Sequence, residues 1–267
     1  MSVATAELTG QDGQKLAFVF PGQGSQYVGM GKALYEASSA ARRVFQQADE
    51  ILGFKLSQLC FEGPADELED TINAQPAILT VSMACLAAVR EKLDELGQNW
   101  QAPRFVAGHS LGEYTALVAA GVLDFSDALT LVRERGRLMK ESGDHRPGGM
   151  AAVIGLDRNT LDAACRQASA DTEQIVSVAN ANSPLQFVIS GERAALDRAI
   201  ELIRAAGART VVPLRISIAS HSPLMQQAAS RLAEIIDRSP LRDPQVPVVT
   251  SLAGQVRTSA DHIRDEL

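Results

Sequence analysis

Aromatic side chains are scarce in this chain of 267 residues, because Phe, Tyr and Trp together make up 4% of it. Apolar residues still account for 46%, so we expect a large core built mainly from Ala, Leu, Val and Ile. Cysteine is also rare, and Cys60, Cys85 and Cys165 are far apart in the sequence. Neither a disulfide framework nor a metal site is therefore expected, nor any cofactor, and the odd count fits a reducing, cytoplasmic compartment.

An excess of positive charge is lacking too, since the net charge is −7, which argues against nucleic-acid binding. No secretory signal is visible at the N-terminus. The longest apolar stretch, residues 77–89, is interrupted by Thr80 and Ser82 and is too short to cross a bilayer. We expect it to be a buried helix that begins after Pro76, in a cytoplasmic protein with no membrane partner.

A Gly-x-Ser-x-Gly turn is the most informative pattern present. Residues 105–108 have the composition of a buried strand, Gly108-His109-Ser110-Leu111-Gly112 follows, and residues 113–120 favour a helix. A serine at such a corner is lifted clear of the sheet beside the helix N-terminus, where backbone N–H groups can stabilise an oxyanion. The pattern predicts Ser110 as a nucleophile; the alternative is a serine that caps the helix.

A nucleophilic serine needs a base, and the chain has four histidines. His109 lies inside the turn and is expected to point away from Ser110, His145 lies in a Gly/Asp/Pro-rich loop, and His262 lies in a polar terminal segment. His221 remains, in a loop after a strand-like run at 211–218, and it follows the serine in chain order as a triad base would. We predict His221 as the general base; the alternative is a structural histidine that caps a helix at 224–237.

The third member of a triad is not identified by the sequence. Asp124, Asp157 and Asp197 lie between the serine and the histidine, but a helix start or a helix surface explains each of them. A backbone carbonyl could orient the imidazole instead.

A glycine-rich loop, Pro21-Gly22-Gln23-Gly24-Ser25-Gln26, follows a predicted strand at 16–20. It is not a dinucleotide loop, because the next glycine is Gly29 and the G-x-G-x-x-G spacing fails. The loop could supply a backbone N–H, that of Gln23, to an oxyanion hole; a simple tight turn is the alternative.

Arg135 is the most discriminating side chain on a predicted helix at 124–140. At about 100° per residue, the apolar face carries Leu129, Val132, Gly136 and Met139, and a face expected to be solvated carries Arg133, Arg137 and Lys140. Arg135 falls at the edge of the apolar face, so its guanidinium needs an anionic partner. That partner is either a structural carboxylate or the carboxylate of a substrate.

The pattern changes after Pro147-Gly148-Gly149. Strands are predicted at 150–156, 174–179, 186–190 and 208–214, and helices at 158–170 and 194–206; this βαββαβ order is ferredoxin-like. Earlier helices are expected near 29–52 and 76–96. We therefore predict an α/β protein: an α/β-hydrolase-like domain with a parallel sheet, residues 1–145 and 215–267, carrying an inserted ferredoxin-like subdomain, residues 146–214. A cleft between the two would suit a ligand.

Four ordered motifs resemble those of one family, the malonyl-CoA:acyl-carrier-protein transacylases and the acyltransferase domains of polyketide synthases. They are Phe18-Val19-Phe20-Pro21-Gly22-Gln23-Gly24-Ser25-Gln26, Gln75-Pro76-Ala77, Gly108-His109-Ser110-Leu111-Gly112-Glu113-Tyr114 and Ser220-His221-Ser222-Pro223-Leu224-Met225. The resemblance extends from about residue 16 to the end of the chain. It implies ping-pong transfer of a malonyl group from malonyl-CoA, through Ser110, to the pantetheine thiol of an acyl carrier protein, in fatty acid or polyketide biosynthesis.

The resemblance also implies roles for individual residues. His221 takes the serine proton, the backbone N–H groups of Gln23 and Leu111 hold the oxyanion, and Arg135 pairs with the malonyl carboxylate. The acyl pocket is expected to be lined by Gln75, Met139 and Asn180. Arg133, Arg137 and Lys140 are a candidate basic stripe for the acidic carrier protein. The residues before His221, Ile218-Ala219-Ser220, match neither tetrapeptide usually tied to malonyl or methylmalonyl choice, and Arg135 favours malonyl.

Members of this family usually continue beyond the equivalent of Leu267, with a backbone carbonyl that orients the histidine. The resemblance thus implies weak turnover for a chain that stops there. Two other functions fit the sequence less well. An acyl hydrolase acting on carrier-protein thioesters would tend to lack Arg135, and a shortened, non-catalytic interaction domain would not need Ser110 and His221.

Overall fold

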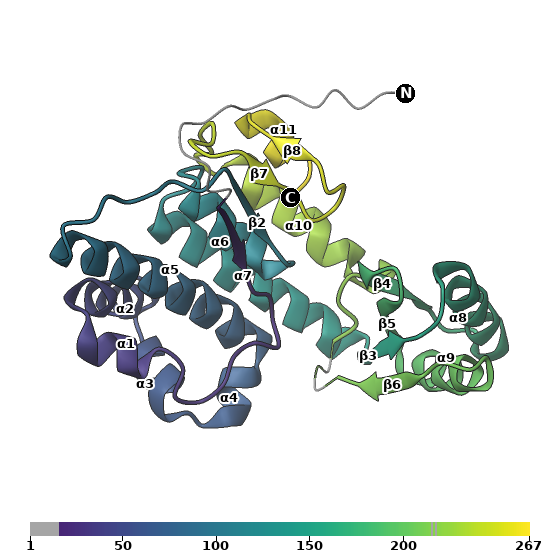
Figure 1. Cartoon of the computed structure of the whole chain (residues 1–267). Coiled ribbons are helices and arrows are strands. Elements are labelled where there is room, and N and C mark those ends of the chain that lie inside the picture. The colour runs from purple at the N-terminus through teal and green to yellow at the C-terminus, as the bar shows by residue number, and fades with distance from the viewer. Residues whose placement is uncertain (1–15, 215, 217) are drawn as a thin grey trace, which may run out of the picture.

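Two β-sheets organise the chain, as the computed structural model in Figure 1 shows. The structure describes residues 16–214, 216 and 218–267. The parts of the predictions that fall on residues 1–15, 215 and 217 lie outside the described residues. In Figure 1 the smaller sheet and its two helices form a lobe beside the helices that surround the larger sheet.

The larger sheet has the strand order β1-β2-β7-β8. Its strands are β1 (Ala17–Phe20), β2 (Phe105–Gly108), β7 (Val248–Val249) and β8 (Val256–Arg257). The first three are parallel, and β8 is antiparallel to β7. Val106 and Val248 pair in the sheet and are fully buried against the helices, so this face of the sheet forms part of the main core.

Helices of the larger unit enclose that core. They are α1 (Lys32–Ala37), α2 (Ser39–Leu52), α3 (Leu56–Glu62), α4 (Ala65–Glu69), α5 (Thr71–Glu95), α6 (Leu111–Ala119), α7 (Phe125–His145), the 3₁₀ turn η1 (Pro223–Met225), α10 (Gln226–Asp237) and α11 (Ala260–Arg264). Helix α5 packs against α2, α6 and α7, and α10 packs along α7.

The smaller sheet is antiparallel with the order β4-β5-β3-β6. Its strands are β3 (Gly148–Ile154), β4 (Val176–Ser183), β5 (Gln186–Glu192) and β6 (Thr210–Pro213), and its helices are α8 (Arg158–Thr172) and α9 (Arg193–Ala205). Leu161, Ile189 and Leu196 are buried in its own core. The predicted α/β class is confirmed, with a mixed larger sheet and a separate antiparallel sheet; the domain limits stay a prediction.

Helix α5 does not begin after Pro76, as the sequence suggested, but at Thr71, with Pro76 inside it. The side chain of Asp70 caps the helix by accepting a hydrogen bond from the Ile72 N–H at 3.1 Å. Proline lacks the N–H that would bond the Ile72 carbonyl. Arg133 of α7 donates to that carbonyl at 3.2 Å instead, so a tertiary contact replaces the missing helical bond.

Two other expected boundaries are wrong. The helix expected at 29–52 is broken at Ser38, whose extended backbone and side chain cap α2 through the Ala41 N–H. Helix α7 continues to His145, which therefore lies in its last turn and not in a loop. A cationic or polar side chain near a helix C-terminus interacts favourably with the helix dipole, so the position suits a histidine.

By length and composition alone, α5 is the one helix of the described chain that could cross a membrane. However, Ala77, Leu79 and Ala84 along it are fully buried among the neighbouring helices. Helix α5 is therefore the central helix of the main core.

The Pro76 contact makes a prediction about stability. Replacing Arg133 with Met leaves the Ile72 carbonyl without its donor and should lower the free energy of unfolding by about 2 kcal/mol. In a Pro76→Ala background the helix can supply its own N–H, so the same Arg133 substitution should cost less. Urea unfolding of the wild type, the two single variants and the double variant measures this coupling. If the losses of unfolding free energy of the two single variants simply add in the double variant, the contact is contradicted.

Candidate active site

Ser110 occupies the corner between β2 and α6 in a conformation that non-glycine residues avoid, with φ 51° and ψ −106°. The flanking glycines make this corner possible. A Cβ on Gly108 would lie 1.9 Å from the Gly112 carbonyl carbon, and one on Gly112 would lie 2.2 Å from the Phe20 carbonyl oxygen. The Ser110 side chain makes no capping hydrogen bond to α6. The helix-cap alternative is therefore wrong, and the hydroxyl is free to face the cleft.

His221 contacts this serine, and both residues line the same cleft. Its Nε2 lies 2.9 Å from the Ser110 Oγ, and its backbone also has a positive φ, 57°. The cap of the following turn is Ser222, whose Oγ accepts a hydrogen bond from the Leu224 N–H at 3.3 Å. His221 therefore does not cap a helix, and its imidazole is placed to take the serine proton.

The pKa of His221 is lowered from 6.5 to about 4. Desolvation is the largest cause, because protein surrounds most of the ring although the residue is open to the cleft on one side. The positive charges of Arg135 and, to a smaller degree, His109 add to the effect. The imidazole is therefore neutral near pH 7, as a general base must be.

No carboxylate completes a triad among the residues that the structure describes. Asp124 pairs with Arg242 at 2.6 Å, Asp157 caps α8 through Thr160, and Asp197 is exposed on α9. In the described part of the chain Ser110 and His221 thus form a Ser–His pair.

Arg135 reaches into the same place from α7. Its Nη2 donates to the Ser110 Oγ at 3.1 Å, and its Nη1 donates to the Gln75 Oε1 at 2.6 Å. The guanidinium also lies 5.5 Å from the centre of the Tyr114 ring. None of the described carboxylates forms an ion pair with it, so the alternative of a structural pair is not what the fold provides. The cation is instead held by neutral groups, Ser110 and Gln75.

A cleft of about 790 Å³ contains these groups. Ser110, His221 and Arg135 line it, together with Met139 of α7 and Asn180 of β4. Three of the other predicted residues lie behind or beside it. Gln75 is fully buried behind Arg135, Gln23 belongs to the loop after β1, and Leu111 opens α6 with its side chain buried.

The sequence reasoning misplaced one residue of the cleft, His109, and missed another, Glu113. His109 lines the cleft rather than pointing away from it, and its Nε2 lies 3.3 Å from the Oδ1 of Asn182, at the end of β4. Glu113, in the first turn of α6, is buried and accepts a hydrogen bond from the Ser251 N–H at 3.2 Å; burial raises the pKa of its carboxyl. These contacts join distant segments, which no local pattern signals.

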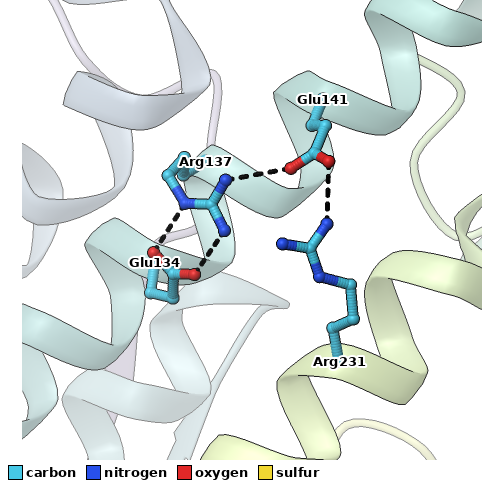
Figure 2. Close-up of polar contacts among 4 residues, drawn as sticks. All are labelled: Glu134, Arg137, Glu141 and Arg231. Atoms are coloured by element: carbon cyan, nitrogen blue, oxygen red, sulfur yellow. Dashed lines mark hydrogen bonds and ion pairs between the residues drawn. The ribbon is translucent and has the colours of Figure 1, made fainter.

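The candidate basic stripe is not an open cationic surface. Figure 2 shows Arg137 between Glu134 and Glu141, at 2.6 and 2.9 Å, with Glu141 also pairing with Arg231 of α10 at 2.8 Å. Lys140 pairs with Asp70. The Arg133 guanidinium lies over the Phe54 ring, 4.5 Å from its centre. The Arg137 pairs lie within α7, whereas Glu141, Lys140 and Arg133 join α7 to neighbouring segments, so these charged side chains have structural partners.

Comparison with known proteins agrees with this geometry. Residues 17–266 match the family described as the acyl transferase domain. Over 253 residues the chain is 47% identical to the malonyl CoA-acyl carrier protein transacylase of Bacillus subtilis, covering 95% of this chain and 77% of that protein. The chain belongs to the malonyl-CoA:acyl-carrier-protein transacylase family. The enzyme of that name from Escherichia coli is 44% identical over 95% of this chain and 79% of its own length.

Solved transacylase structures share the fold. That of Coxiella burnetii has a TM-score of 0.86 at 40% identity, covering 95% of this chain and 78% of that one. A malonyl-transacylase solved in complex with its type II PKS acyl-carrier protein has a TM-score of 0.87 at 42% identity, with coverage of 95% and 79%. The family resemblance found in the four motifs is thereby confirmed.

The lowered pKa of His221 can be measured directly. In an NMR titration of the free protein, the His221 ring should stay neutral as the pH falls through 6.5 and gain its proton only near about pH 4. Replacing Arg135 with Met removes one positive charge and should raise this pKa. Arg137→Met is the matched control, because its charge is already balanced by Glu134 and Glu141. A His221 pKa near 6.5 that is the same in the wild type and in Arg135→Met would contradict this prediction.

Proposed function

We propose that this protein transfers a malonyl group from malonyl-CoA to the pantetheine thiol of an acyl carrier protein, through an ester on Ser110. The observation that carries the proposal is the 2.9 Å contact of Ser110 with His221, beside an Arg135 that has no carboxylate partner among the described residues. Family membership over 95% of the chain supports it. The chain is thus an [acyl-carrier-protein] S-malonyltransferase.

In the first half-reaction the Ser110 Oγ attacks the thioester carbonyl while the His221 Nε2 takes its proton. The carbon–sulfur bond then breaks, and the imidazolium returns the proton to the departing CoA thiolate. CoA–SH leaves and a malonyl ester remains on Ser110. Because the neutral imidazole is the resting form, the base is ready without prior loss of a proton.

Two backbone N–H groups are proposed to hold the oxyanion that forms at the carbonyl. Leu111 is the first residue of α6, so its N–H has no helical partner and lies at the positive end of the helix dipole. Gln23 lies in the loop after β1, and its side chain is tied to Thr71 by a 2.9 Å hydrogen bond. Oxyanion donors of this kind contribute about 3 kcal/mol each to transition-state stabilisation.

Arg135 is proposed to select malonyl. Its two terminal nitrogens now contact Ser110 and Gln75, and a planar guanidinium can instead form two parallel hydrogen bonds with a carboxylate. Met139 and Asn180 are proposed to bound the acyl pocket, and Gln75 to hold Arg135 from behind. An acetyl group has no carboxylate, so it would gain nothing from this cation.

In the second half-reaction the pantetheine thiol of the carrier protein attacks the malonyl ester. His221 takes the thiol proton and returns it to the Ser110 Oγ as the ester bond breaks.

We also propose a cytoplasmic location. The cysteines fit it, because Cys60 and Cys165 are free and buried and Cys85 is free.

Loading of Ser110 tests the proposed function. After mixing with malonyl-, methylmalonyl- and acetyl-CoA, intact-mass spectrometry should detect a malonyl adduct that Ser110→Ala cannot form. Adding the phosphopantetheinylated carrier protein should discharge the adduct onto the carrier. Release of the acyl group to water at the same rate without carrier protein would support a hydrolase instead.

The role of Arg135 is tested by Arg135→Met. Since two charge-assisted hydrogen bonds are lost, kcat/KM for malonyl-CoA should fall by roughly 10²–10³-fold. Loading from acetyl-CoA should fall far less, so the ratio of the two rates should collapse. A variant that keeps the wild-type preference would contradict the assignment of the carboxylate to Arg135.

A further inference from the structure

A continuous series of hydrogen bonds lies behind the cleft. It begins at Ser110, which accepts from Arg135 at 3.1 Å, and passes from Arg135 to the Gln75 Oε1 at 2.6 Å. The Gln75 Nε2 then donates to the Thr71 Oγ1 at 2.9 Å, and the Thr71 hydroxyl donates to the Gln23 Oε1, also at 2.9 Å. Thr71 is therefore the junction between the arginine and the glycine-rich loop.

The direction of this series follows from the chemistry of its members. A guanidinium only donates, so the Gln75 oxygen must face Arg135 and its amide nitrogen must face Thr71. The threonine hydroxyl accepts that bond and has one proton, which it gives to Gln23. The second amide hydrogen of Gln75 faces the Met139 sulfur at 3.4 Å. Each polar atom thus has one role, and the orientation of Gln75 is determined.

Burial makes these bonds costly to lose. Thr71 is 6% exposed and Gln75 is fully buried, so water cannot readily replace a missing partner. A buried donor or acceptor that loses its partner carries the full cost of its desolvation. Without the Thr71 hydroxyl, the buried Gln75 amide would be left in that state, and the half-buried Gln23 side chain would lose its hydrogen-bond donor.

We propose that Thr71 is a positioning residue that uses one hydroxyl to hold both the carboxylate-binding arginine and the oxyanion loop. It acts on Arg135 through Gln75, and on the backbone N–H of Gln23 through the side chain of that residue. The inference rests on the proposed function, in which these two groups bind the malonyl carboxylate and the oxyanion.

The two branches have different consequences. Loosening Arg135 affects malonyl far more than acetyl, because an acetyl group has no carboxylate to bind. Loosening the loop at Gln23 affects every acyl group equally, because each forms the same oxyanion. Removing the Thr71 hydroxyl should therefore lower the rate of Ser110 loading in two ways. One effect, through Arg135, depends on the acyl group, and the other, through Gln23, is the same for every acyl group.

The experiment replaces Thr71 with Val, which keeps the branched shape and removes the hydroxyl. Rates of Ser110 loading from malonyl-CoA and acetyl-CoA are measured by mass spectrometry, in the wild-type and Arg135→Met backgrounds. In the wild-type background kcat/KM for malonyl-CoA should fall by roughly tenfold, and for acetyl-CoA by less. In the Arg135→Met background the two losses should become equal.

Two further variants separate positioning from stability. Thr71→Ser keeps the hydroxyl and should restore most of the malonyl rate. Thr80→Val is the matched control on the same helix, because Thr80 is fully buried and its hydroxyl has no partner among the described residues. It should leave loading unchanged, and the thermal midpoints of all variants show which losses reflect unfolding.

Outcomes distinguish this inference from the proposed function. If wild-type Ser110 carries no malonyl group, the proposed function fails. The NMR signals of the Gln75 side-chain amide, which should move in Thr71→Val and not in Thr80→Val, then still test the contact. Should Thr71→Val load both substrates at wild-type rates, or Thr71→Ser lose as much as Thr71→Val, the positioning role is overturned.

Discussion

The hydrogen bond between Ser110 and His221 is the constraint on which the site depends, because its partners are 111 residues apart in the chain. The whole smaller sheet lies between them in sequence. Its first strand starts against the segment before His221: a Cβ on Gly148 would lie 2.8 Å from that of Ala219. The chain therefore leaves and re-enters the larger unit at neighbouring points. The insertion can lengthen the chain between Ser110 and His221 without separating them in space.

Both partners have positive φ angles, 51° and 57°. Such backbone conformations cost about 1–3 kcal/mol each for non-glycine residues and persist only where the surroundings impose them. At Ser110 the surroundings are the two close backbone approaches at Gly108 and Gly112. Holding these conformations costs part of the free energy of folding. In return the Ser110 hydroxyl points at the His221 imidazole and not at the N-terminus of α6, which it would otherwise cap.

The balance of charge along α7 explains how an acidic protein keeps one arginine of that helix out of any ion pair among the described residues. Arg137 is paired with two glutamates, whereas Arg135, two residues earlier and on another side of the helix, contacts only neutral groups in the described part of the chain. The charge of Arg135, which has no ion-pair partner among the described residues, lowers the pKa of His221. A carboxylate bound to Arg135 would compensate for it and remove one cause of that lowering. The imidazole would then become a stronger base when the matching substrate is present.

Local patterns predicted the parts of the fold that local geometry determines. The strand, Gly-x-Ser-x-Gly turn and helix around Ser110 were readable because the glycine spacing and the change of period lie within a few residues, although Gly112 also packs against Phe20. The βαββαβ order was readable because each strand and helix has its own hydrophobic period. The histidine that contacts Ser110, His221, was predicted by elimination among four. Such arguments work where a short segment carries its own structural requirements.

Contacts between distant segments determined the features that the sequence did not predict. Pro76 lies inside α5 because Arg133 satisfies the Ile72 carbonyl, and Arg133 was expected on a solvated face. His109 lies in the cleft because Asn182 reaches it from the smaller sheet. Nothing in the sequence marks Thr71 as part of the site, since threonine is common at the start of a helix. Its role depends on Gln23 and Gln75, which both bond to its hydroxyl. In each case the deciding contact comes from a distant part of the chain.

The position of Gly136 shows why Arg135 can join that network. A Cβ at Gly136 would lie 2.6 Å from the Thr71 carbonyl oxygen, so α7 can approach the start of α5 this closely only with a glycine there. This approach places the preceding residue, Arg135, within hydrogen-bonding distance of Gln75. A larger residue at 136 would move the two helices apart, and the guanidinium would have to stretch or lose its contact with Gln75. The separation of two helices is thus set by one missing side chain, and that separation decides whether the arginine is held in place.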